Sequence, residues 1–176
     1  RQAFGVPEGG AMVLNQLGDL AMLRRNVARA RQVYRQGVER YEKLDDRGGL
    51  AAALTGLGRA ALAQGDHAEA GAHFYRALDI ARDMQFVRVL LSLLTAIAEW
   101  MCAGGQAERG TELCALVAAH PSSEQKDREQ AAKTLAHCQA DLSPEQYAEV
   151  VRRGKEGDLD DAVLDVQAEL AAWAGL

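Results

Sequence analysis

A short stretch of the sequence, ALAQGDHAEA at residues 61–70, gathers side chains that can bind a metal ion. His67 and Glu69 lie within it, and His73 follows soon after. Imidazole and carboxylate groups are common zinc ligands, but the spacing does not match the HExxH motif, which places two histidines on one helix face. His67 and His73 are six positions apart, so they would point in different directions on a helix. We therefore predict no metal site.

The same stretch has the composition of a corner between two helices. Glycine readily adopts the left-handed conformation that ends a helix, so we expect Gly65 to close the first helix. Asp66 then caps the second helix, because its carboxylate can accept backbone N–H groups that have no partner within the helix. A structural role accounts for these residues without any chemistry.

Three cysteines, Cys102, Cys114 and Cys138, are the other candidates for reactivity. An odd number without CxxC spacing predicts free thiols in a reducing compartment. No histidine forms a recognisable motif with them, and His120 and His137 have no partner in the sequence. Because no nucleophile, base and orienting group can be assembled, we predict that the chain is not an enzyme and carries no cofactor.

The composition excludes several classes of function. The chain has 176 residues and a formal net charge of −5, which disfavours non-specific binding to nucleic acid. No uncharged apolar run approaches the ~20 residues of a membrane span, and no signal peptide opens the sequence. We expect a cytoplasmic protein that binds neither membranes nor nucleic acid directly. Since the sequence opens on Arg1, we also expect it to be one domain of a larger protein.

A period of forty residues organises the chain. The segment LTGLGRAALAQGDHAEAGAHF from Leu54 aligns with LTAIAEWMCAGGQAERGTELC from Leu94 and with LNQLGDLAMLRRNVARARQVY from Leu14, each shifted by 40 residues. In each copy, apolar and small residues recur at helical spacing in two blocks, which a polar corner separates. Each copy is therefore predicted to be a helical hairpin, and the whole chain to be all-α.

Small residues at matching positions allow the helices to approach closely, and larger residues fill the space between hairpins. The small residues are Gly18, Gly58 and Ala98 on the first helices and Ala30, Ala70 and Gly110 on the second; the larger ones are Tyr34, Phe74 and Cys114. A lone hairpin leaves an apolar face exposed, so we expect the copies to stack into a solenoid. The predicted order is a linker at residues 1–10, hairpins at about 11–48, 49–86 and 87–120, and capping helices at 121–176.

This pattern resembles the tetratricopeptide repeat. The residues that carry the resemblance are Leu54, Leu57, Gly58, Ala61, Ala70, Phe74 and Ala77. The chain departs from that repeat in lacking its common tryptophan and closing proline, and its period exceeds the usual ~34 residues. The resemblance implies a right-handed superhelical solenoid with a concave groove, which binds a protein or peptide without catalysis.

Over most of its length the chain is similar to the carboxy-terminal repeat region of LuxR-type and AfsR-type bacterial regulators, in which such repeats follow a STAND ATPase module. The similar segments are ALAQGDHAEAGAHFYRALDIARD, GGQAERG and EQYAEVVRRGKEGDLDDAVLDV. The resemblance implies a regulatory role in signal transduction and transcription. The sequence has neither a Walker-type loop nor a helix-turn-helix, so ATP binding and DNA reading would belong to the parent protein only.

Two surfaces are candidates for partner binding. The resemblance implies that the first helices line the groove with Asn15, Asp19, Thr55, Arg59, Thr95 and Glu99. A basic docking face for an acidic partner would comprise Arg24, Arg25, Arg31 and Arg35. Some tetratricopeptide domains hold carboxylate tails with a lysine and an asparagine, and Asn15 and Asp19 stand at those places here, which disfavours a chaperone tail.

Two functions remain open from the sequence. The first is a protein-interaction module whose partner is another protein, a peptide, a domain of its own parent chain, or a second copy in a homodimer. The second is a sensor that binds a small ligand in the groove, which a ligand-dependent rise in melting temperature would support.

Overall fold

The computed structural model describes residues 9–174, which form nine α-helices and one short 3-10 helix. They are α1 (Gly9–Leu23), α2 (Val27–Leu44), α3 (Arg47–Ala63), α4 (His67–Asp83), α5 (Val87–Ala103), α6 (Ala107–Ala119), α7 (Gln125–Cys138), η1 (Gln139–Asp141), α8 (Pro144–Glu156) and α9 (Leu159–Ala174). Since the described residues contain no strand, the predicted all-α fold is confirmed. Of the predicted linker, residues 1–8 lie outside the described part, whereas Gly9 and Gly10 begin α1. No helix within residues 9–174 combines the length and apolar character needed to cross a membrane.

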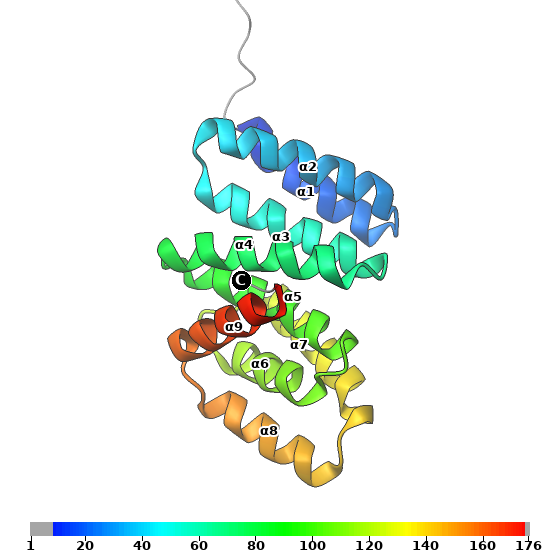
Figure 1. Cartoon of the computed structure of the whole chain (residues 1–176), viewed down its shortest axis with the longest axis vertical. Coiled ribbons are helices and arrows are strands. Elements are labelled where there is room, and N and C mark those ends of the chain that lie inside the picture. The colour runs from blue at the N-terminus through cyan, green and yellow to red at the C-terminus, as the bar shows by residue number, and fades with distance from the viewer. Residues whose placement is uncertain (1–8, 175–176) are drawn as a thin grey trace, which may run out of the picture.

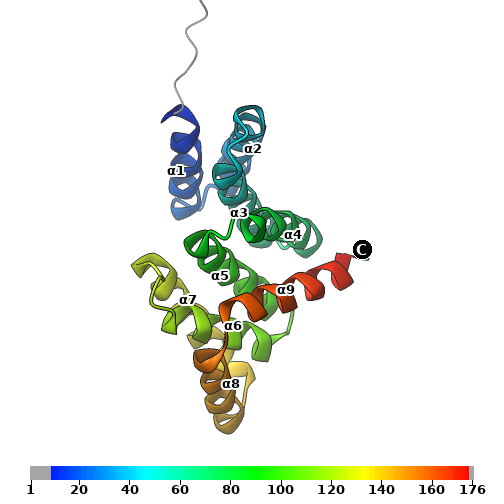
Figure 2. The ribbon, with the colours of Figure 1, turned by 90° about the vertical axis from the view of Figure 1, so that its left-hand side faces the viewer.

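Three helical hairpins stack along the long axis of the molecule. Figure 1 shows α1–α2, α3–α4 and α5–α6 following one another along this axis. In Figure 2, α1, α3 and α5 each lie to one side of the second helix of their hairpin. Each hairpin packs on the next, with α2 against α3 and α4 against α5. This arrangement is the predicted solenoid.

The corner between α3 and α4 has the predicted cap, and Asn26 caps α2 in the same way. The backbone N–H of Arg29 donates to Asn26 Oδ1 at 3.1 Å, and that of Glu69 donates to Asp66 Oδ1 at 2.9 Å. Gly65 has a φ of 78°, in the left-handed region that glycine tolerates best. The polar stretch that opened the sequence analysis is therefore the corner between α3 and α4.

An aromatic ring is wedged between consecutive first helices. Tyr34 of α2 is buried, and a methyl group added at either Gly18 of α1 or Gly56 of α3 would overlap its ring. Both glycines are needed because only a residue without Cβ leaves room for the ring. Phe74 occupies the same place in α4, against Gly58 of α3. The ring position thus sets the distance between neighbouring hairpins.

The C-terminal helices depart from the hairpin pattern. α7 packs beside α5 and α6, whereas α8 packs on α6 so closely that a side chain at Gly154 would overlap the carbonyl of Glu112. α9 then turns back along the stack to α4 (Figures 1 and 2). There the ring of Trp173 meets that of Trp100 edge-on, with centroids 5.1 Å apart. These helices cover the third hairpin and one side of the second.

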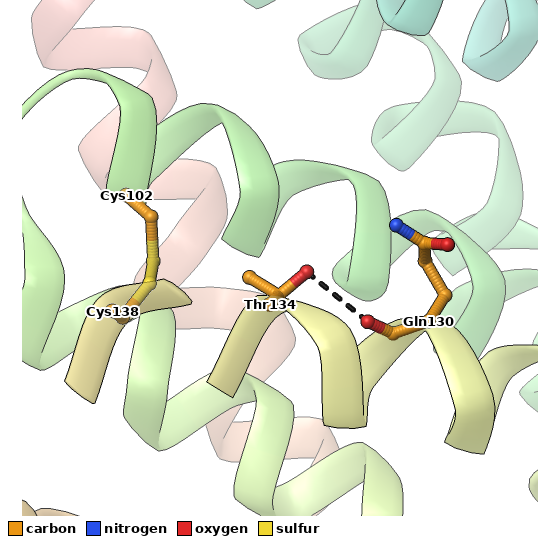
Figure 3. The surroundings of a disulfide bond; sticks show 4 residues. All are labelled: Cys102, Gln130, Thr134 and Cys138. Atoms are coloured by element: carbon orange, nitrogen blue, oxygen red, sulfur yellow. Dashed lines mark hydrogen bonds between the residues drawn. A yellow bond between two sulfur atoms is a disulfide. The ribbon is translucent and has the colours of Figure 1, made fainter. Parts of the chain in front are cut away.

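Cys102 and Cys138 form a disulfide that joins α5 to α7 (Figure 3). The two residues are 36 positions apart in sequence, and their Cα atoms are separated by 6.2 Å. The expectation of free thiols is therefore wrong for these two cysteines. They meet because the chain returns to the same side of the stack after one hairpin, a proximity that local cysteine spacing cannot reveal. Cys114 remains free and is buried.

We predict that Gly56→Val lowers the free energy of unfolding by about 2 kcal/mol, because the new side chain collides with the Tyr34 ring in a packed interior. Urea denaturation monitored by circular dichroism measures the change. Ala52→Val, at an exposed position of the same helix, serves as the control and should shift stability by less than ~1 kcal/mol. Equal effects of the two substitutions would contradict the close packing of the Tyr34 ring against Gly56.

We predict that reduction of the Cys102–Cys138 disulfide lowers the free energy of unfolding by about 3 kcal/mol, the loss expected from opening a covalent loop of this length. Urea denaturation with and without reductant gives the difference. Titration of thiols in the denatured, unreduced chain supplies the independent check: one reactive thiol, that of Cys114, is expected, and three would contradict the pairing.

Candidate partner-binding site

The first-helix face, defined as the surface formed by α1, α3, α5 and α7, carries the predicted groove residues. On α1, Asn15 Nδ2 donates to the carbonyl of Gly49 at 3.2 Å, which ties α1 to α3. Asp19 is exposed and accepts a hydrogen bond of 2.7 Å from the hydroxyl of Tyr34. Burial, together with this bond, raises the pKa of Tyr34, so the tyrosine stays protonated. The hydroxyl can therefore donate to Asp19, which helps to position the Tyr34 ring.

Thr55 and Thr95 do not reach this surface. Both are buried, and their hydroxyls donate at 2.8 Å to the carbonyls of Ala51 and Leu91, one turn earlier in their own helices. The sequence-based assignment treated the residue after each initial leucine as solvent-facing, but in α3 and α5 the neighbouring helices enclose this position. The two threonines are therefore removed from the set of candidate ligand contacts.

Arg59 of α3 and Glu99 of α5 bring opposite charges to the middle of the first-helix face. Arg59 Nη2 donates to the carbonyl of Ser92 at 3.4 Å, and none of the ion pairs within residues 9–174 involves its guanidinium. Glu99 Oε1 is shielded from solvent and has no hydrogen-bond donor among the described residues. Burial raises the pKa of Glu99, although Arg59, Gln130 and Lys133 act in the opposite direction.

Sequence reasoning missed the contribution of α7 to this face. Gln130 and Lys133 of α7 interact with Glu99, and the nearby Asp127 is buried, which raises its pKa. Residues 121–176 were assigned to a terminal cap, yet α7 packs beside α5 as a further first helix would. The sequence did contain a signal for this, because small or apolar residues recur in α7 at the spacing of a buried helix face: Ala131, Thr134 and Cys138.

The structure divides the predicted basic docking face in two. Arg31 donates to Glu69 of α4, and Arg35 Nη2 lies 3.5 Å from the same carboxylate. Arg31 thus links α2 to α4 within the stack, and Arg35 adds a longer contact from an exposed position. Arg24 and Arg25 are exposed in the turn between α1 and α2. Arg24, Arg25 and Arg35 are exposed, whereas Arg31 is partly buried against α4.

The stretch that suggested a metal site is used for packing. The carboxylate of Glu69 is engaged by Arg31 and lies 3.5 Å from His73 Nε2. The carbonyl of His67 accepts a hydrogen bond of 3.0 Å from Trp100 Nε1. Burial lowers the pKa of His73, which favours its neutral form. Residues 9–174 contain no group of three side chains that could hold a metal ion.

The buried thiol of Cys114 is not poised for nucleophilic chemistry. Burial, with the charge of Glu99 nearby, raises the pKa of Cys114 to about 12. Since the thiolate is the reactive species, this thiol is inert at neutral pH. Cys114 stands where Tyr34 and Phe74 stand in the first two hairpins, so it fills space in the core.

Comparison with known proteins identifies the first half of the stack. Residues 11–83 match the model of the tetratricopeptide repeat family. No curated protein and no solved structure matches the chain. The matched residues extend from α1 to α4, so the first two hairpins are similar to tetratricopeptide repeats, a module that generally mediates protein–protein interaction and is generally non-catalytic. α5 and α6 continue the same stack beyond the matched residues.

We predict that Glu99→Gln stabilises the chain relative to wild type, by an amount that grows as the pH rises above about 4.5, the ordinary pKa of glutamate. The folded chain holds the Glu99 proton to higher pH than the unfolded chain, so wild type loses stability through this window. Glutamine has no proton to lose. Urea denaturation of both chains at pH values from about 4 to about 8 measures the difference in stability. This range includes the pH values over which Glu99 is expected to lose its proton. A difference independent of pH would show that the pKa of Glu99 is unperturbed.

Proposed function

We propose that the chain is a non-catalytic interaction module that binds a segment of another protein on the first-helix face. The observation that carries this proposal is a row of charged side chains across three consecutive first helices. Arg59 lies on α3, Glu99 on α5 and Lys133 on α7. A polypeptide that crosses these helices meets positive, negative and positive groups in turn.

The groups in this row have unused bonding capacity. The guanidinium of Arg59 makes one long hydrogen bond to a carbonyl, and one oxygen of Glu99 has no donor among the residues described. Hydrogen bonds between charged partners are stronger than those between neutral ones. A peptide carboxylate would supply the guanidinium of Arg59 with a charged partner.

We further propose that the chain is the sensory or regulatory repeat region of a bacterial signalling or transcriptional regulator, with another domain of that protein as one candidate ligand. The similar segments of sequence, including GGQAERG at the corner between α5 and α6, support this context. A cytoplasmic location is part of the same proposal. The Cys102–Cys138 disulfide is the one observation that opposes this location, because disulfides persist mainly in oxidising compartments and the cytoplasm is reducing.

We predict that peptides selected from a random displayed library against the intact chain lose about tenfold in affinity on Arg59→Glu or Glu99→Arg, since each reversal places like charges together. Fluorescence anisotropy with the selected peptides measures the loss. Arg152→Glu on α8, away from the first-helix face, is the matched control and should leave affinity unchanged. Peptides that bind tightly but ignore both reversals would place the binding site elsewhere and refute the proposal.

A further inference from the structure

One end of the stack presents an apolar stripe, defined as Val13, Leu17 and Leu20 of α1. These side chains are 46%, 44% and 42% exposed. They follow one another at helical spacing and therefore form one continuous strip on the helix. α1 packs against α2 and α3 with its other faces. Aliphatic side chains grouped in this way on a soluble domain mark an interaction site.

The equivalent positions in the next two hairpins are internal interfaces. In the 40-residue register, the apolar stripe corresponds to Ala53, Leu57 and Ala60 of α3 and to Leu93, Ile97 and Trp100 of α5, all of them buried. Leu57 packs with Tyr34, and Ala53 packs with Tyr41, both on α2. In α3 and α5, these positions pack against the second helix of the preceding hairpin. The apolar stripe is the same surface on α1, where no preceding helix is described.

The charged residues beside the apolar stripe determine which kind of helix can dock on it. Between the first two hairpins, Arg31 of α2 donates to the side chains of Gln64 and Glu69, two hydrogen-bond acceptors. The 40-residue register places Arg24 and Arg29 at these two acceptor positions of the first hairpin. Both are exposed arginines, which can only donate. A helix seated here therefore needs a carboxylate where α2 has Arg31.

The apolar stripe also differs from its equivalents in the place where an aromatic ring would sit. Gly56 of α3 leaves room for the ring of Tyr34, but α1 has Gln16 at the corresponding position. Gln16 is exposed and would fill that space. A helix docked on α1 consequently needs a small residue where α2 has Tyr34. This requirement excludes an unaltered α2-type helix as the occupant, and so do the paired arginines.

We propose that the apolar stripe of α1, together with Arg24 and Arg29, binds an acidic amphipathic helix from a partner protein in the place that α2 occupies relative to α3 and α4. The apolar face of this partner helix covers Val13, Leu17 and Leu20. Its carboxylate lies between the two arginines, and a small residue faces Gln16. The site is separate from the first-helix face, so it holds whether or not that face binds a peptide.

Two stapled helical peptides test this proposal against the intact chain. The acidic probe has the sequence of residues 26–45 with Arg31→Glu, Tyr34→Ala and Arg35→Glu, and the basic probe carries Tyr34→Ala alone. We expect isothermal titration calorimetry to show at least about tenfold tighter binding of the acidic probe. The double variant Arg24→Glu/Arg29→Glu should reverse this preference. Leu17→Glu, at an exposed position that leaves the fold intact, should abolish binding of both probes.

Controls and contrary outcomes are equally specific. Leu164→Glu changes an exposed leucine of α9, 56% accessible, and should leave the affinity for the acidic probe unchanged. Equal affinity for the two probes, no binding of either, or binding that survives Leu17→Glu would overturn the proposal. A stable dimer of the chain alone in sedimentation equilibrium, dissociated by Leu17→Glu, would also overturn it, because the occupant would then be a second copy.

Discussion

The stack depends on the ring of Tyr34, which is enclosed by the backbones of two first helices. Glycine at positions 18 and 56 allows both α1 and α3 to approach the ring closely, which sets the distance between one hairpin and the next. Glycine within a helix costs about 0.5–1 kcal/mol relative to alanine, and burial of the ring offsets this cost. The hydrogen bond to Asp19 prevents the ring from shifting within its slot.

Ion pairs between hairpins add specificity to this packing. Arg76 of α4 pairs with Glu42 of α2, and Glu69 of α4 pairs with Arg31 of α2. Such partly exposed pairs contribute little stability individually, with a typical value of about 0–1 kcal/mol. Their greater effect is to exclude wrong partners, since like charges in the same places repel. Shape therefore sets the spacing of the hairpins, and charge selects which helices can become neighbours.

The repeat period was sufficient to predict the three hairpins, their corners and the glycine–aromatic packing, because each depends on contacts that recur every forty residues. It was insufficient for Thr55 and Thr95, whose burial depends on the rotation of a helix about its own axis. It also failed for the disulfide and for α7, since the period ends after α6 and the path of the chain there depends on non-repeating contacts. Among these is the close approach of Gly154 to Glu112.

The two ends of the stack differ in a way that limits assembly. At the far end, α8 carries Arg152, whose guanidinium is paired with Glu149 and Glu156 of the same helix. Among residues 12–173, none of the large apolar side chains that are exposed belongs to α8. At the near end, α1 exposes its apolar stripe. If α1 of one copy bound α8 of another, the copies would join head to tail into an open fibre. The polar surface of α8 is not complementary to the apolar stripe, which disfavours this arrangement. Among the described residues, α8 therefore gives the apolar stripe of another copy no apolar surface to dock on.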